Sequence, residues 1–208
     1  MNHDDFQGPE PVEGLPEAPP EGEKILWQGR PNWWALARDA LIVRWVAAYF
    51  LLLGLWRGWA AWDRADLALG IDAFSVLAAM GALTCAILLI CAYVMARATV
   101  YTITNKRVAM RVGAALTVTL NLPYRWIGAA DLALNNDGTG TIALTLIGDT
   151  RFSYLVLWPH ARPWRMSNTQ PALRAIPDAE KVAALLAAHA QASVTRGPIR
   201  DAQTIAAE

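Results

Sequence analysis

The chain has 208 residues, of which 55% are hydrophobic and 17% are charged, and its mean hydropathy is +0.24. About a quarter of the residues in an ordinary soluble domain are charged, so this composition is apolar for a protein that works entirely in water. The 18 basic residues balance the 18 acidic residues. This balance excludes the basic surplus that is typical of nucleic-acid binding, and we expect no nucleic-acid partner.

The N-terminal stretch, residues 1–23, is acidic and rich in proline and contains no Lys or Arg. A secretory signal peptide begins with basic residues and continues with an apolar run, so this stretch is not one. Its composition cannot bury much apolar surface and predicts a disordered or extended tail. At the other end of the chain, we expect residues 193–208 to form a flexible tail.

Two apolar runs follow the acidic stretch. Residues 73–96 contain no charged residue and lie between Asp72 and Arg97. About 20 helical residues span a bilayer core, so this run predicts a transmembrane helix, with a buried helix of a soluble protein as the alternative. Residues 41–62 predict a second one, although they include Arg44 and Arg57, whose long side chains can extend to opposite membrane surfaces.

Tryptophans gather at the ends of the first apolar run and in the segment before it, residues 24–40. We expect Trp33 and Trp34 of the stretch "WQGRPNWW" to lie at the lipid–water boundary, where Trp is enriched. Packing inside a soluble domain is the alternative for these rings. We also expect Gly29 to permit a turn, Pro31 to fix the direction of the chain, and Trp27 to pack back on the domain that follows the membrane.

Basic residues flank the two apolar runs on their outer sides, whereas the connection between the runs, residues 63–72, is neutral to slightly acidic. The flanking basic residues are Lys24, Arg30 and Arg38 before the runs and Arg97, Lys106, Arg107 and Arg111 after them. Basic residues favour the cytoplasmic side of a membrane. We therefore expect a multi-pass protein of the bacterial inner membrane, with both termini in the cytoplasm and a periplasmic loop at 63–72.

Residues 97–192 differ in composition and predict a cytoplasmic domain of short antiparallel strands. β-Branched and aromatic residues alternate on both sides of a turn at Asn105 and Lys106, and a third strand ends at Pro123. The strands at 127–134 and 141–148 flank "NNDGTG", which is a strong hairpin signal. We expect a last strand at 151–158 and an irregular stretch at 159–177.

The end of this domain predicts an amphipathic helix at 178–190. Val182, Leu185, Leu186 and His189 follow the helical spacing i, i+3, i+4 and i+7. The pattern as a whole predicts a small β-barrel or bent antiparallel sheet with a C-terminal capping helix.

The sequence contains no pattern that is typical of a catalytic or metal site. Its histidines, His3, His160 and His189, have no metal-ligand spacing, and no Ser has the G-x-S-x-G setting. Asp137 lies in a hairpin turn and not after a buried parallel strand, as a phosphorylated aspartate would. We expect a protein that is not an enzyme and that uses no cofactor or metal.

Two groups of side chains are candidates for binding. Arg97, Lys106, Arg107 and Arg111 follow the second apolar run and either bind anionic lipid head groups or only set the topology. The stretch "WPHARPWR" combines Trp and Arg, which are frequent in protein–protein hot spots. We expect a partner-binding surface there, or a lid over the barrel, and its residues are Trp158, His160, Arg162, Pro163, Trp164 and Arg165.

The motifs on both sides of the apolar runs resemble those of the bacterial pleckstrin-homology-like membrane proteins. The motif residues are Gly22, Glu23, Trp27, Gly29, Arg30 and Pro31 before the runs and Tyr101, Ile103, Thr104, Asn105 and Arg107 after them. This resemblance implies a seven-stranded, strongly bent sheet that is capped by the C-terminal helix. It also implies that the protein self-associates as a homo-oligomer.

From Leu15 to about Ala190 the chain is also similar to proteins that assist the assembly of photosynthetic complexes in purple phototrophic bacteria, most specifically at "WPHARPW". This narrower resemblance implies a scaffold in the chromatophore membrane whose partners are photosynthetic reaction-centre subunits or co-assembly factors. Such proteins have been described with three spans, whereas we predict two. The alternative is a general pleckstrin-like envelope protein that binds anionic lipid or a membrane partner.

Overall fold

The computed structural model describes residues 12–15, 17–114, 117–148 and 152–191. The chain forms two compact units. Residues 33–96 form the helical unit, and the chain before and after them forms a second unit, which we call the β-unit. The β-unit is therefore assembled from two separate parts of the sequence. The predicted tail at 193–208 and residues 1–11 of the predicted acidic tail lie outside the described residues.

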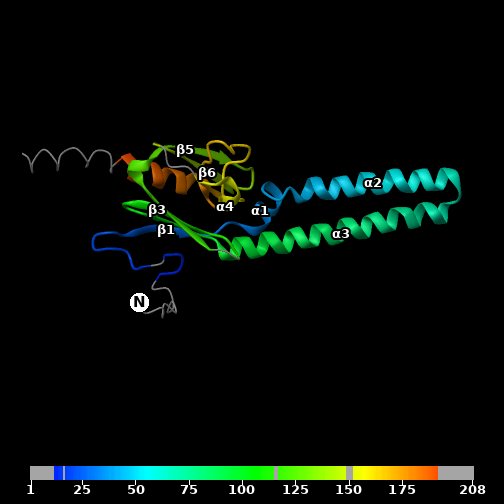
Figure 1. Ribbon diagram of the computed structural model, residues 1–208, viewed down its shortest axis with the longest axis horizontal. Coiled ribbons are helices and arrows are strands. Elements are labelled where there is room, and N and C mark those ends of the chain that lie inside the picture. Colours follow the sequence, from blue (N-terminus) through cyan, green and yellow to red (C-terminus); the bar gives the residue numbers. More distant parts are fainter. Residues whose placement is uncertain (1–11, 16, 115–116, 149–151, 192–208) are drawn as a thin grey trace, which may run out of the picture. The chain divides into compact units, whose positions relative to one another are not determined.

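The first sheet of the β-unit has the strand order β1-β2-β3-β4, and all neighbours are antiparallel (Figure 1). The strands are β1 (Ile25–Gly29), β2 (Val100–Thr104), β3 (Arg107–Val112) and β4 (Val118–Pro123). The structure confirms the predicted β2–β3 hairpin and the predicted third strand. The sequence does not predict β1. This strand pairs with β2, which follows the entire helical unit in the sequence, and no turn signal marks the pairing.

The second sheet has the order β5-β6-β7, again with antiparallel neighbours. Its strands are β5 (Ile127–Leu134), β6 (Gly140–Leu146) and β7 (Ala172–Ile176), and a short 3-10 helix, η1 (Tyr124–Trp126), leads into β5. The predicted hairpin is confirmed: the N–H of Asn135 donates to the carbonyl oxygen of Thr139 at 2.8 Å. Gly138 has a left-handed φ of 77° in the turn, which favours glycine.

Two predictions for the end of this domain are wrong. The predicted strand at 151–158 contains the short helix α4 (Tyr154–Leu157), and β7 lies inside the stretch that we predict to be irregular. A run of four apolar residues fits one helical turn as well as a strand, so its periodicity is not decisive. Pro171 and Pro177 flank β7 and obscure its strand signal.

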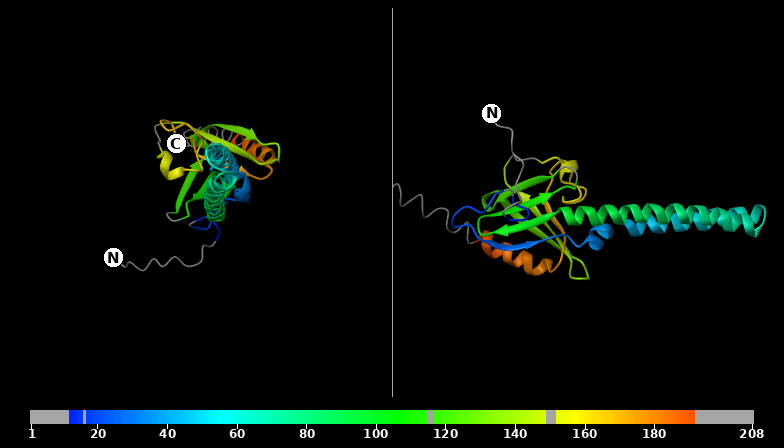
Figure 2. Two further views of the ribbon diagram at one scale, coloured as in Figure 1. Left: turned by 90° about the vertical axis from the view of Figure 1, so that its right-hand side faces the viewer. Right: turned by 90° about the horizontal axis from the view of Figure 1, so that it is seen from below.

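The core of the β-unit is built from both sheets, α4 and the C-terminal helix, which comprises residues 179–191 (Figure 2). The fully buried large side chains include Tyr101, Ile103, Leu122, Leu144 and Leu173. The predicted apolar face of the C-terminal helix is confirmed, since Val182 and Leu186 are buried in this core. Antiparallel strands in two sheets, packed with this helix, agree with the fold class that the resemblance implies.

The helical unit consists of α1 (Trp33–Asp39), α2 (Val43–Arg64) and α3 (Leu67–Ala98), the last of which continues into the β-unit. Only residues 65 and 66 separate α2 from α3, so most of the predicted loop at 63–72 is helical. α1 and α2 are bent by 55° relative to each other. Ile42 lies at this break with a left-handed φ of 49°, a conformation that is strained for a β-branched residue.

Glycines bring α2 and α3 into close contact. A Cβ atom on Gly58 would lie 3.0 Å from the carbonyl oxygen of Gly70, and one on Gly70 would lie 2.9 Å from the carbonyl oxygen of Gly58. A Cβ atom on Gly81 would lie 2.6 Å from that of Phe50. Gly54 and Gly58 form the G-x-x-x-G pattern that allows transmembrane helices to approach closely.

By length and composition, α3 meets the requirement for a membrane-spanning helix. It has 32 residues, and only 6% of its most apolar stretch is buried. α2 does not meet this requirement by itself, but the bent pair of α1 and α2 meets it together. Among the described residues, the prediction of two regular spans is therefore supported for 73–96 and not for 41–62 alone.

Candidate interaction surface

The stretch that the sequence predicts as a partner surface forms a loop between α4 and β7. The N–H of Arg162 donates to the carbonyl oxygen of Gln170 at 2.9 Å, and the Nη1 atom of Arg162 donates to the side-chain oxygen of Gln170 at 3.1 Å. Gln170 in turn donates from Nε2 to the hydroxyl of Thr145 on β6 at 3.1 Å. These hydrogen bonds join the two ends of the loop 163–169 to each other and attach it to β6 of the second sheet.

His160 anchors the start of this loop inside the β-unit. Its side chain is 2% exposed, with Nδ1 lying 2.6 Å from the hydroxyl of Tyr101 and Nε2 lying 3.1 Å from the hydroxyl of Thr99. The backbone N–H of Arg174 donates to the Tyr101 oxygen at 3.2 Å. All partners are satisfied when Tyr101 donates its proton to Nδ1 and the Nε2–H group of a neutral His160 donates to Thr99.

The environment of His160 favours this neutral form. Burial, with a smaller contribution from the Arg174 guanidinium, lowers the pKa of His160 to about 3. Burial also raises the pKa of Tyr101 above its ordinary value, so its hydroxyl remains a donor at neutral pH. His160 is therefore a buried group that fixes the start of the loop to the β-unit.

Arg162 connects the base of the loop to β5. Its Nη1 atom lies 2.6 Å from a carboxylate oxygen of Asp131, and both side chains are partly exposed. Together with the bond to Gln170, this ion pair makes Arg162 a positioning residue of the loop.

The remaining predicted residues of the stretch face solvent. Trp158 is 42% exposed and Trp164 is 89% exposed, and Pro163 and Arg165 are also exposed. Trp164 has a left-handed φ of 63°, which is uncommon for an aromatic residue and which indicates a constrained loop. An exposed indole in a constrained backbone is the arrangement expected of an interface anchor.

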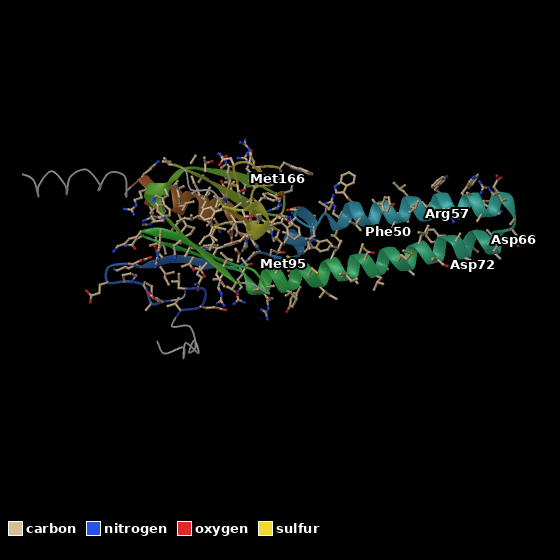
Figure 3. The ribbon with its side chains drawn as sticks, viewed as in Figure 1. Phe50, Arg57, Asp66, Asp72, Met95 and Met166 are labelled. Atoms are coloured by element: carbon tan, nitrogen blue, oxygen red, sulfur yellow. The ribbon has the colours of Figure 1, made fainter. Side chains whose placement is uncertain are left out.

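Other apolar side chains of α4 and of the loop are also exposed, although the sequence does not single them out. Leu155 is 84% exposed, Val156 is 55% exposed and Met166 is 65% exposed. Met166 is labelled in Figure 3. We define the exposed patch as Leu155, Val156, Trp158, Trp164 and Met166. Leu155 and Val156 escape prediction because they lie in the wrongly assigned strand, where alternate residues would be buried.

The predicted lipid-binding cluster of basic residues is divided between the two ends of the β2–β3 hairpin. Lys106 and Arg107 lie at the turn, whereas Arg111 pairs in register with Val100 at the start of β2. Arg97 lies in the last turn of α3, just before β2 in the chain. Only Arg97 and Arg111 are therefore at the end of the hairpin that adjoins α3 in sequence.

At the turn, Arg107 is engaged with the N-terminal segment. It lies 2.9 Å from a carboxylate oxygen of Glu23, whose side chain is 4% exposed. Lys106 donates to the carbonyl oxygen of Glu21 at 3.5 Å. These contacts tie Arg107 and Lys106 to the N-terminal segment, although Lys106 remains exposed.

Asn105 completes this link. Its side-chain oxygen accepts from the N–H of Lys24 at 2.9 Å, and its side-chain nitrogen donates to the carbonyl oxygen of Gly22 at 3.0 Å. One motif of the resemblance precedes the helical unit in the sequence and the other follows it. Hydrogen bonds thus join the two motifs in the folded β-unit. Within the tail that we expect to be disordered or extended, Leu15 is fully buried.

The tryptophans ahead of α2 have different surroundings. Trp27 packs against the β-unit core, as predicted. Gly29 makes room for this ring instead of forming a turn, since a Cβ atom there would lie 2.4 Å from the Trp27 indole. Trp33 and Trp34 begin α1, are about half exposed, and lie edge to face with ring centroids 6.0 Å apart.

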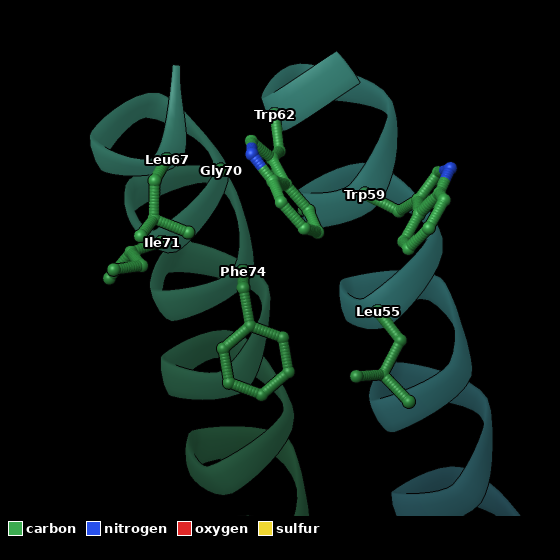
Figure 4. A pocket seen from close by; sticks show the side chains of 8 residues that line it. Leu55, Trp59, Trp62, Leu67, Gly70, Ile71 and Phe74 are labelled. Atoms are coloured by element: carbon green, nitrogen blue, oxygen red, sulfur yellow. The ribbon is translucent and has the colours of Figure 1, made fainter.

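A shallow apolar pocket of about 270 Å³ lies on the helical unit where Gly58 and Gly70 meet (Figure 4). Its other lining residues are Leu55, Trp59, Trp62, Leu67, Ile71 and Phe74. None of them is charged, so this pocket offers apolar contact and little that could orient a polar ligand. In the part of the chain that the structure describes, no group of His, Cys, Asp or Glu could hold a metal ion.

Comparison with known proteins defines the class of this chain. The bacterial PH domain family matches residues 39–190, and the chain belongs to this family. The match includes α2 and α3 as well as most of the β-unit. No solved structure matches the chain.

The chain is also similar to a protein of Rhodobacter capsulatus. The two are 45% identical over 196 residues, which are 93% of this chain and 91% of the relative. That relative is described as an uncharacterised 23.7 kDa protein in the 5′ region of puhA.

Proposed function

We propose that the chain is a membrane-anchored assembly factor for the photosynthetic reaction centre of a purple phototrophic bacterium, of the PuhB type. The observation that carries this proposal is the relative in the 5′ region of puhA, a gene of the reaction-centre region, which matches nearly the whole chain. The sequence "WPHARPW", which suggests the same role, coincides with the exposed loop of the β-unit. The protein acts as a scaffold, with neither catalytic activity nor a cofactor.

The helical unit is the membrane anchor in this proposal. Leu52, Leu83 and Ile90 are each more than 60% exposed, which would be costly in water and is favourable in lipid. The close glycine contacts between α2 and α3 support a paired hairpin inside the bilayer. α2, extended by the bent α1, is the second span.

The charges near the helix ends support one orientation of this hairpin in the inner membrane. Asp66 lies in the α2–α3 connection, Asp72 lies less than two helical turns after it, and Arg57 lies about two and a half helical turns before it (Figure 3). The basic surplus lies instead before α1 and after α3. Both termini are therefore cytoplasmic in this proposal, and a reporter that is active only in the periplasm should be active when inserted after Ala65 and inactive when fused after Gln191.

The exposed patch, together with Pro163 and Arg165, is the surface that contacts a nascent reaction-centre subunit or a co-assembly factor. His160 and Arg162 fix the position of this surface through their hydrogen bonds to the β-unit. Apolar and aromatic side chains at high exposure, on a loop fixed by buried hydrogen bonds, are typical of a pre-organised interface. Self-association as a homo-oligomer is a further part of the proposal.

Anionic lipid binding is the alternative function, with Arg97 in the last turn of α3, Arg111 opposite Val100 at the start of β2, and Trp33 and Trp34 at the boundary. It predicts that the purified protein binds vesicles of phosphatidylglycerol and that this binding weakens as salt is raised. An assembly factor for a protein client does not require this salt dependence.

The decisive experiment is deletion of the gene in its own host, followed by a near-infrared absorption spectrum of membranes at equal protein. We expect a selective loss of reaction-centre absorption that the gene restores in trans. An unchanged spectrum would contradict the assembly role and leave the lipid-binding alternative.

A further inference from the structure

β5 differs from every other described strand in its exposure. After Ile127 all its residues are exposed, whereas β7, the other outer strand of the same sheet, is buried at all five positions. β5 pairs with β6 on one side, and no described strand pairs with its other side (Figure 1). Proteins normally blunt such an edge, because its free N–H and C=O groups accept another strand.

The hydrogen-bonding pattern shows which groups of β5 are available. Along an edge strand, the backbone N–H and C=O groups of one residue point to the paired strand, and those of the next residue point outward. The N–H of Leu144 donates to the carbonyl oxygen of Pro171, so Leu144 faces β7, and its register partner Ala130 faces away from β6. By the same alternation, Leu132 and Leu134 also direct their N–H and C=O groups to the open side.

The features that protect edges in other proteins are weak here. β5 contains neither Lys nor Pro, and its irregularity lies at its start, between Ile127 and Ala129. Its one charged residue, Asp131, is paired with Arg162. From Ala130 to Leu134, β5 pairs with β6 without a register shift. These five extended residues span about 14 Å.

We propose that β5 binds an extended segment of the client protein as an additional strand of the β5-β6-β7 sheet. This inference rests on the proposed function, because it takes the client to be a reaction-centre subunit. The free donors and acceptors of Ala130, Leu132 and Leu134 supply the main-chain bonds. The side chains along the edge are Ala and Leu apart from the paired Asp131, so the segment that fits is uncharged and apolar at alternate positions.

Proline tests the edge selectively. The double variant Ala130→Pro/Leu132→Pro removes two outward N–H groups and no bond to β6, so it preserves the sheet, since edge strands tolerate proline at such positions. Ala184→Val/Ala187→Val, at two exposed positions of the C-terminal helix outside this edge, is the control. Both are produced as the full chain in the host that lacks the native gene, and reaction-centre absorption is measured at equal amounts of the variant protein.

We expect the proline variant to lower reaction-centre absorption about tenfold, since two main-chain bonds are lost, and the valine control to restore it fully. Normal absorption with the proline variant would overturn the edge inference and leave the proposed function intact. If deletion of the whole gene has no effect on absorption, the proposed function fails instead.

A photo-crosslinker keeps the inference testable if the proline variant does not accumulate. Benzoylphenylalanine at position 132 should form an adduct with one reaction-centre subunit, whereas the same group at the exposed position 184 of the C-terminal helix should not. An adduct with a second copy of this chain, with lipid alone, or equally from both positions would overturn the inference.

Discussion

The β-unit and the helical unit are both rich in apolar residues, but they place them differently. In the β-unit, side chains such as Leu122, Leu144 and Leu173 are removed from solvent in one core. In the helical unit, large apolar side chains remain exposed, and Gly58 and Gly70 lie where α2 and α3 approach too closely to admit a Cβ atom without movement. The β-unit therefore has a core that can stabilise it in water, whereas the exposed apolar surface of the helical unit fits the membrane anchor that we propose.

This contrast is sharpest when the same substitution is made in both units. Leu122→Ala removes a fully buried side chain from the β-unit and should cost about 2–5 kcal/mol of unfolding free energy. Leu83→Ala in α3, where the side chain is 64% exposed, should cost about 0.5 kcal/mol or less. Hydrogen exchange of the full chain in detergent measures both losses, and equal losses would show that the two units do not differ in this way.

The role of glycine in the helical unit can be tested next. Gly70→Val places a branched side chain against the backbone of Gly58 and should weaken the pairing of α2 with α3 by about 1–3 kcal/mol. Cys85, which is partly buried against the residues around Leu41, should then react faster with an apolar maleimide in detergent. Ala79→Val, on an exposed face of the same helix, is the control and should leave this rate unchanged.

The features that could be predicted from sequence are those with a local pattern. The β2–β3 hairpin follows from alternation and a turn at Asn105, and the C-terminal helix follows from the spacing of Val182 and Leu186. β1 has no such signal, since its partner lies beyond the helical unit. The break at Ile42 is also unpredictable, because nothing in an apolar run marks a β-branched residue for a left-handed conformation.

The same limit applies to the candidate site. Sequence identifies the stretch 158–165 by its Trp and Arg content, but it does not separate the inward His160 from the outward Trp164. That separation depends on partners far along the chain, namely Tyr101 for His160 and Asp131 for Arg162. In the same way, the ion pair of Glu23 and Arg107 joins a residue before the helical unit in the sequence to one after it. It therefore has no local sequence signature.

The buried network around His160 predicts a pH dependence that belongs to the β-unit alone. The pKa of His160 is about 3 in the folded protein, below the ordinary value of 6.5, so the unfolded chain binds the additional proton. Stability is then complete above pH 6.5 and falls as the pH is lowered towards 3. Between pH 7.5 and 5.5 the β-unit should lose on the order of 1 kcal/mol of unfolding free energy.

Hydrogen exchange, corrected for the intrinsic effect of pH on exchange rates, measures this loss in the full chain. His160→Gln lacks the titrating ring and should show a flat profile over the same range, even though it is less stable at pH 7.5. Equal slopes for the two proteins would mean that His160 is not the group responsible.

The smallest change in stability is expected at Trp164, where the largest change in function is also expected. Its side chain is 89% exposed, so Trp164→Ala should alter the unfolding free energy by no more than about 0.5 kcal/mol. Trp126→Ala, a partly exposed tryptophan of the β-unit outside the loop, is the matched control. Reaction-centre absorption in the complemented deletion host is the functional measurement.

The comparison of the two units explains why this test is informative. Exposed tryptophans of the helical unit, such as Trp56, are accounted for by lipid if that unit spans the membrane, so their exposure does not imply a partner protein. Trp164 belongs to the unit that buries its apolar residues, where such exposure needs another cause. We therefore expect Trp164→Ala, and not Trp126→Ala, to lower reaction-centre absorption. Normal absorption with a stable Trp164→Ala protein would remove the exposed patch from the proposed interface.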